Sequence, residues 1–253
     1  MPITTAASRQ HREVQIVLRT HPLGEADRII VGLSRERGII RSVAKGVRRA
    51  SSTMGARLEP FMVSDVQMVH GRTLDTVTQA VTRRAYAAPI VADWQRYIQA
   101  CAVAEVAEHL GKSEEQEITR LFDLTAGAFS ALARGTHSSE HISTSYLLRA
   151  ISFSGWHLEL LRCVRCGQER DLHSFSLADG GVVCDGSRQA GDRPLAEQIL
   201  VYLQDLAQGR WQHIDSDTYP AEWVAQAAGL VRGYVQWHLD HPFKSFVLLE
   251  GDQ

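Results

Sequence analysis

The chain has 253 residues, of which 44% are hydrophobic and 22% charged, so it can bury one or two ordinary cores and is not intrinsically disordered. It contains no run of eighteen apolar residues, which argues against membrane insertion, and its start lacks the apolar stretch of a secretory signal. Four cysteines are too few for the disulfide framework of a secreted fold, and we expect a cytoplasmic protein.

The first third of the chain is strongly basic, although the formal net charge of the whole is only −2. Residues 1–85 contain 14 Arg or Lys against 7 Asp or Glu, a balance of +7 that leaves −9 for the rest. Such an asymmetry is typical of a protein in which one part meets a polyanion and the other part does not.

Five short β-rich runs, separated by turn residues, follow one another in this basic part. No helix long enough for a βαβ crossover lies between them, which favours a small antiparallel β-barrel of the OB-fold type. The predicted strands cover residues 14–18, 28–33, 38–44, 61–69 and 74–81.

The apolar spacing changes to the helical three and four residues from about Trp94 onward. Further helices are predicted over about 115–133, 143–160, 195–208 and 221–238, and residues 246–249 form either a short strand or a docked end. The fold class is therefore α+β. We predict a DNA-binding OB-fold over residues 1–85 and a helical domain over 86–253, with a zinc-ribbon-like insertion at about 161–193.

Cations stand beside small, flexible residues directly after the third predicted strand. Arg35 and Arg37 fall in the preceding turn, so a hairpin can place both groups on one side. Cations that neutralise phosphates release counterions and read no bases. Base stacking has little support, because Phe61 is the only Phe, Tyr or Trp before residue 86. The alternative is a merely solvated surface. The candidate DNA-binding residues are Arg35, Arg37, Lys45, Arg48, Arg49, Arg57 and Arg72.

Three cysteines in the insertion have metal-ligand spacing. Cys163 and Cys166 form a C-x-x-C knuckle, and Cys184 follows 18 residues later, as in zinc ribbons. The fourth cysteine of that pattern is replaced by Ser187, a poor zinc ligand. Asp185 and His173 are candidate substitutes for it. Two interpretations stay open: one structural zinc ion, or a degenerate knuckle held by packing and hydrogen bonds.

Several short motifs, in their order and spacing, resemble the bacterial recombination and repair family RecO. They are Leu18, the G-E-A-D-R of residues 24–28, Gly38, the S-V-A-K-G-V-R-R of 42–49, the L-E-P-F of 58–61 and the C-V-R-C-G of 163–167. The resemblance implies an amino-terminal OB-fold, a helical carboxy-terminal domain and, in many members, a zinc-binding insertion.

The resemblance also implies a function and partners. Similar proteins bind single- and double-stranded DNA and anneal complementary strands. They work with RecR to load RecA on DNA covered by single-strand binding protein, whose acidic tail docks on the helical domain. We therefore expect a nucleoid-associated DNA repair mediator with no membrane partner.

Two other functions stay open. One is a zinc-dependent nucleic-acid-processing enzyme that uses the coordination position left by Ser187. The other is a protein adaptor that binds no DNA. We expect no catalytic residues, because the sequence lacks nucleotide-binding glycine motifs and the paired histidines of metalloproteases.

Overall fold

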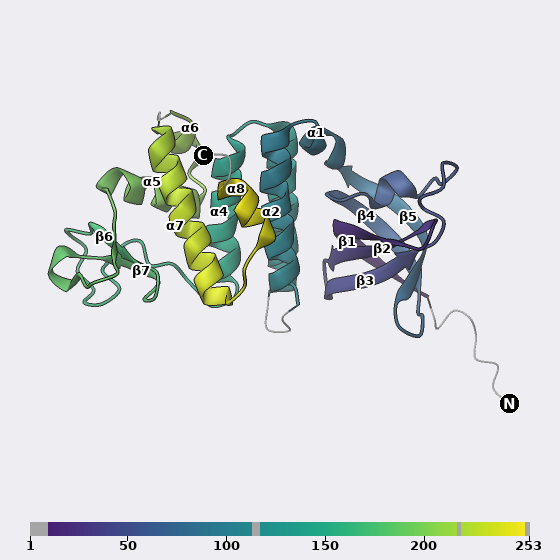
Figure 1. The fold of residues 1–253 in the computed structure, drawn as a ribbon, viewed down its shortest axis with the longest axis horizontal. Coiled ribbons are helices and arrows are strands. Elements are labelled where there is room, and N and C mark those ends of the chain that lie inside the picture. The colour runs from purple at the N-terminus through teal and green to yellow at the C-terminus, as the bar shows by residue number, and fades with distance from the viewer. Residues whose placement is uncertain (1–9, 113–116, 217–218, 251–253) are drawn as a thin grey trace. The chain divides into compact units, whose positions relative to one another are not determined.

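The computed structural model describes residues 10–112, 117–216 and 219–250 (Figure 1). The chain forms two compact units, residues 1–134 and 135–253. The first unit contains the strands expected for the basic part together with the helices that follow them. The division at residues 85 and 86, predicted from the change of periodicity, falls inside this first unit and stays a prediction about domains.

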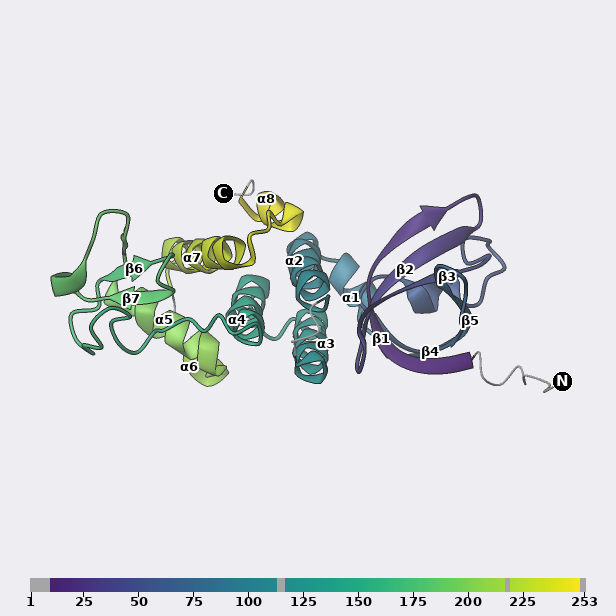
Figure 2. The same cartoon turned by 90° about the horizontal axis from the view of Figure 1, so that it is seen from below.

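Five strands form a closed barrel in the order β1-β2-β3-β5-β4, which confirms the predicted OB-like fold (Figure 2). Neighbouring strands are antiparallel except β3 and β5, which run parallel where the barrel closes. β1 is longer than predicted and has a bulge, so its first half pairs with β4 and its second half with β2. The strands are β1 (Gln10–Leu23), β2 (Asp27–Ser34), β3 (Gly38–Ala44), β4 (Met62–Val69) and β5 (Asp75–Ala85).

The segment between β3 and β4 closes one end of the barrel. It includes a short 3-10 helix, η2 (Gly55–Leu58), whose Leu58 is fully buried in the barrel core. Val47, near the start of the segment, is also part of this core at 5% exposure. Because burial of these two side chains holds the segment against the barrel, the residues around Val47 have fixed positions.

Three helices complete the first unit: α1 (Ala87–Val91), α2 (Trp94–Leu110) and α3 (Ile118–Arg134). α2 begins at the predicted Trp94, and the start predicted for α3 near residue 115 lies outside the described residues. The carbonyl of Gly111, just after α2, accepts a hydrogen bond of 2.9 Å from the N–H of Ile39. This bond joins the end of α2 to the start of β3.

The second unit is a set of helices with a small three-stranded sheet. Helices α4 and α7 lie side by side (Figure 1). Among the described residues, no helix has the length and apolar character needed to cross a lipid bilayer. The elements are α4 (Ser139–Ser152), β6 (Ser174–Ser176), β7 (Gly181–Val183), η3 (Asp185–Ser187), β8 (Arg193–Pro194), α5 (Glu197–Gln208), α6 (Trp211–Ser216), α7 (Ala221–Leu239) and α8 (Lys244–Glu250).

Two sequence predictions in this unit were wrong. The helix predicted over 143–160 begins earlier and ends at Ser152, because the chain leaves the helix in a turn that ends at Gly155 with a φ of +83°. Beyond this turn, Glu159 exchanges backbone hydrogen bonds with Gly180 and Val182. Residues 246–249 were predicted to form either a short strand or a docked end, and the strand is wrong because these residues belong to a helix, α8. Its buried side chains, Phe246 and Leu249, are three residues apart, which is a helical spacing.

Candidate nucleic-acid interface and cysteine cluster

Two backbone N–H groups of the turn after β3 donate hydrogen bonds to the start of β2 and to the β1–β2 turn. Gly46 has a φ of +68°, a left-handed conformation that favours glycine. Its N–H donates to Oδ1 of Asp27 at 2.8 Å. The N–H of Arg48 donates to a carbonyl in the β1–β2 turn at 2.9 Å. With Val47 buried between these two bonds, the turn has little freedom to move.

Three cations of this turn are directed to solvent. Lys45, Arg48 and Arg49 are all exposed. Nη1 of Arg48 donates to the carbonyl oxygen of Gly24 at 3.0 Å, which orients its guanidinium without neutralising it. None of the three makes an ion pair with a carboxylate of the part of the chain that the structure describes. This cationic turn, Lys45 with Arg48 and Arg49, therefore presents uncompensated positive charge.

Arg35 and Arg37 lie at the opposite end of the β2–β3 hairpin. Arg28 at the start of β2 pairs with Ala44 at the end of β3, whereas the two arginines belong to the turn that joins the other strand ends. At 3.3 Å per residue, the length of the strands separates them from Lys45 by about 20 Å. The hairpin therefore holds the two groups of cations at its opposite ends, and their place on one side of the barrel stays a prediction.

The two arginines of that turn have carboxylate partners. Nη1 of Arg35 lies 2.9 Å from Oδ1 of Asp123, and its guanidinium lies 5.4 Å from the ring centroid of Phe122. Nη1 of Arg37 lies 3.2 Å from Oε1 of Glu13. These contacts join the turn to α3 and to β1. Because each arginine has a carboxylate partner, less uncompensated positive charge is available to a polyanion here than at the cationic turn.

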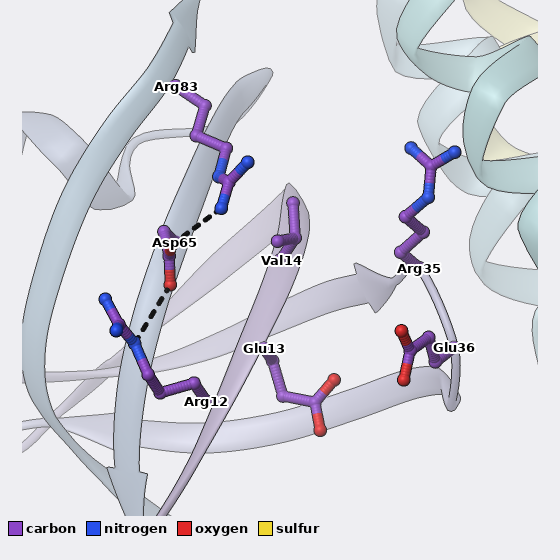
Figure 3. Close-up of a pocket in the computed structure, with 7 residues that line it drawn as sticks. All are labelled: Arg12, Glu13, Val14, Arg35, Glu36, Asp65 and Arg83. Atoms are coloured by element: carbon purple, nitrogen blue, oxygen red, sulfur yellow. Dashed lines mark hydrogen bonds and ion pairs between the residues drawn. The ribbon is translucent and has the colours of Figure 1, made fainter.

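A groove of about 280 Å³ lies beside the β2–β3 turn (Figure 3). Asp65 stands between two arginines in it: Nη2 of Arg83 is 2.8 Å, and Nε of Arg12 is 3.6 Å, from its carboxylate oxygens. No local sequence pattern indicates this pair, because only the pairing of β4 with both β1 and β5 brings the two arginines together. The groove is lined by Arg12, Glu13, Val14, Arg35, Glu36, Asp65 and Arg83.

A second groove of about 740 Å³ lies on the other side of the same turn and includes Arg37, Arg41 and Lys112. Arg41 and Lys112 both lie within 4 Å of Glu108, whose side chain is 5% exposed and also binds Arg19 at 2.8 Å. Three cations thus share one buried carboxylate, which compensates their positive charge only in part.

Arg57 and Arg72, the remaining candidate cations, belong to two other segments of the barrel domain, η2 and the β4–β5 loop. Nη1 of Arg57 donates to the carbonyl of Ala80 in β5 at 2.9 Å. Arg72 is exposed in the β4–β5 loop. Phe61 is 2% exposed and packs edge-on against Phe129, so it offers no surface on which a base can stack. The strand register separates the cationic turn from Arg35 and Arg37, which lie at the other end of the β2–β3 hairpin.

The three predicted cysteines do meet in space. The sulfur atoms of Cys163, Cys166 and Cys184 lie within 4.8 Å of one another, and those of Cys166 and Cys184 are 3.6 Å apart. Cys163 and Cys184 are buried and Cys166 is exposed. Such a group of thiols can bind a metal ion.

Backbone amides surround the sulfur of Cys163. Burial raises the pKa of its thiol, but hydrogen bonds from the N–H groups of Cys184, Arg165 and Cys166 outweigh this and lower the pKa to about 6. A low pKa favours the thiolate near neutral pH, and the thiolate is the form that binds metals.

Neither predicted substitute joins the three sulfurs. Among the described residues the metal-binding group contains the cysteines alone. Nδ1 of His173 instead lies 3.0 Å from Oδ2 of Asp185, so these two side chains pair with each other. The side chain of Ser187 bonds to Cys184, which places a hydroxyl beside the thiols where the usual pattern has a fourth cysteine.

A network of ion pairs centred on Arg165 supports the knuckle. Its two terminal nitrogens bind both oxygens of Asp192, at 2.6 and 2.9 Å, and its Nε donates to Asp179 at 2.9 Å. The hydrogen bond from Arg165 lowers the pKa of Asp192 despite burial. Nη1 also donates to the carbonyl of Ser187 at 2.7 Å. Arg165 thus joins the C-x-x-C turn to the segment around η3 without any metal.

Two family models match this chain. The model described as Recombination protein O N terminal matches residues 9–86, which include the whole barrel. The model described as Recombination protein O C terminal matches residues 91–246, which include the cysteine cluster and the helices around it.

Proposed function

This chain belongs to the recombination protein O (RecO) family of DNA repair and recombination mediators, and we propose that it binds single- and double-stranded DNA and anneals complementary strands. The observation that carries the proposal is the cationic turn. Lys45, Arg48 and Arg49 are exposed on a rigid turn and have no carboxylate partner among the described residues. Most other cations of the barrel have a carboxylate partner, although some share one, whereas this turn gathers three cations without any such partner among the described residues. We infer that it is the surface best suited to phosphates.

The mechanism that we propose is electrostatic. Phosphates of two strands would be neutralised at the barrel, which reduces their mutual repulsion and lets complementary bases pair. Because the barrel's single phenylalanine is buried, backbone contacts rather than stacking would supply the affinity, and binding would not depend on base sequence.

The acidic remainder of the chain, with its balance of −9, would contact proteins rather than DNA. We propose that it works with RecR to load RecA onto DNA covered by single-strand binding protein, whose tail it would bind, at the nucleoid in the cytoplasm. We infer that the chain acts by binding and not by catalysis. In support, the three-cysteine group contains no imidazole or carboxylate of the described residues that can serve as acid or base.

Fluorescence anisotropy of a labelled single-stranded oligonucleotide across a salt series tests this proposal. We expect binding that weakens steeply with salt, is equal for different sequences, and is followed by faster annealing when the complementary strand is added. A protein that binds neither strand form at low salt would instead be an adaptor.

We also propose that Cys163, Cys166 and Cys184 hold one structural zinc ion, with the Ser187 hydroxyl beside the fourth position. The ion would supply a crosslink between the C-x-x-C knuckle and the segment after β7. The support is the close approach of the three sulfurs and the amides that favour a thiolate at Cys163.

Replacement of Ser187 by cysteine should then tighten zinc binding by about tenfold or more, because a thiolate replaces a neutral hydroxyl beside Cys184. Competition with a chromophoric chelator measures the affinity. Asp185→Cys is the matched control: it adds a thiol on an adjacent, exposed residue that is outside the sulfur group, and should change the affinity little. Equal affinities for the wild type and Ser187→Cys would contradict the proposed coordination.

A further inference from the structure

A second group of metal-ligating side chains lies in the barrel, far along the sequence from the cysteines. His11 belongs to β1, His70 follows β4 and Asp75 begins β5. They meet because His11 pairs with Met68 near the end of β4, and β4 and β5 form a hairpin. One potential ligand atom of each of the three side chains lies within 4.8 Å of the other two.

The two imidazole rings are stacked, with centroids 4.3 Å apart and an angle of 19° between their planes. The Asp75 carboxylate faces both: Oδ2 is 3.3 Å from Nε2 of His11, and Oδ1 is 3.2 Å from Nδ1 of His70. Oδ1 also accepts the N–H of Gly71 at 3.3 Å, which fixes the carboxylate against the loop.

The bonding of His11 is incomplete. Both of its ring nitrogens are buried, and neither has a hydrogen-bond partner among the described residues. The 3.3 Å approach of Nε2 to Asp75 is close enough for an ion pair but lacks the alignment of a hydrogen bond. Buried polar atoms are almost always satisfied by protein, water or an ion, and no described protein group occupies these nitrogens, so they are available to bind an ion.

We propose that His11, His70 and Asp75 form a metal site for a divalent ion of the zinc class. Zinc binds imidazole nitrogen and carboxylate oxygen at about 2.0–2.2 Å, so neighbouring ligand atoms of a tetrahedral site are about 3.3–3.5 Å apart. Nε2 of His11 and Nδ1 of His70 lie 3.3 and 3.2 Å from different oxygens of Asp75. One potential ligand atom of each side chain lies within 4.8 Å of the other two, so rotation of the side chains, without movement of the backbone, would direct all three at a common ion. Two imidazoles also favour zinc over magnesium or calcium, which prefer oxygen ligands.

Such an ion would join the first strand of the barrel to the β4–β5 loop. His70 is half-exposed, at 49%, so the fourth position faces solvent and water can fill it. The loop between His70 and Asp75 contains Arg72, and metal binding would therefore fix the loop that carries this exposed cation. The site is separate from the cysteine cluster, and its existence does not depend on DNA binding.

Zinc binding to the full chain tests the site directly. Equilibrium dialysis should show that His70→Ala and Asp75→Asn each bind one zinc equivalent fewer than the wild type, whatever number the cysteines hold. Zinc should also raise the melting temperature of the wild type by more than that of either variant. His21→Ala is the matched control: it removes an exposed histidine from the other end of β1 and should leave the zinc count unchanged.

The absorption spectrum of the cobalt-loaded protein distinguishes the barrel ligands from the cysteines. Loss of the barrel site should leave the sulfur-to-cobalt charge-transfer absorption of the cysteines unchanged while removing absorption from nitrogen and oxygen ligands. His70→Ala removes a half-exposed loop side chain and Asp75→Asn keeps the side-chain shape, so at least one folded variant, checked by circular dichroism, is expected. Equal zinc counts for the wild type and a folded variant would overturn the proposal.

Discussion

Alanine at Lys45, Arg48 and Arg49 together should weaken binding to single-stranded DNA at least tenfold at physiological salt, for every base sequence alike. Each phosphate contact contributes about 0.7 to the slope of log affinity against log salt for single strands, so loss of three contacts should reduce the slope by about 2. The effect is large because these cations have no carboxylate partner among the described residues. Anisotropy across a salt series, followed by an annealing assay, measures it.

The matched control removes three other arginines of the barrel, Arg12, Arg83 and Arg84. It makes the same change in net charge, but Arg12 and Arg83 already bind Asp65. We expect a smaller loss of affinity and a smaller change of slope. If the control variant instead loses as much affinity as the variant of the cationic turn, the groove beside Asp65 is the principal DNA surface.

Gly38→Ala should destabilise the first unit by about 2–5 kcal/mol, through backbone strain and overpacking together. Gly38 has a φ of +73°, and a Cβ added there would lie 2.4 Å from the carbonyl oxygen of Gly111. That oxygen also accepts the N–H of Ile39, so relief of the clash would disturb the bond between α2 and β3. Urea unfolding followed by circular dichroism, with hydrogen exchange of the β3 amides, measures the loss.

Gly24→Ala separates strain from overpacking. Gly24 also has a positive φ, +56°, but an added Cβ would meet no atom within 4 Å. Only the cost of a left-handed conformation remains, about 1–2 kcal/mol. If the two variants lose the same free energy of unfolding, the end of α2 moves away from residue 38 without an energetic cost. The contact between Gly38 and Gly111 would then contribute little to stability.

The local patterns of the sequence were sufficient to predict most elements. Each strand of a small barrel buries one face, so its apolar residues alternate, and turn residues mark its ends. Helix α2 begins at Trp94 as predicted, since helical spacing is equally local. The C-x-x-C knuckle and Cys184 were also found from spacing alone. The prediction was wrong at residues that make long-range contacts: Glu159 was expected in a helix but pairs with Gly181.

The same distinction between local sequence patterns and long-range contacts applies to the candidate site. The sequence by itself determined which residues are cationic, that small and flexible residues stand beside them, and that Ser187 replaces a fourth cysteine. Only the tertiary structure decided which charges remain uncompensated. Arg35 pairs with Asp123, 88 residues away, while Lys45 has no such partner among the described residues. The reason is physical: strand register and helix packing select the partner of a charge, and neighbours in the chain do not.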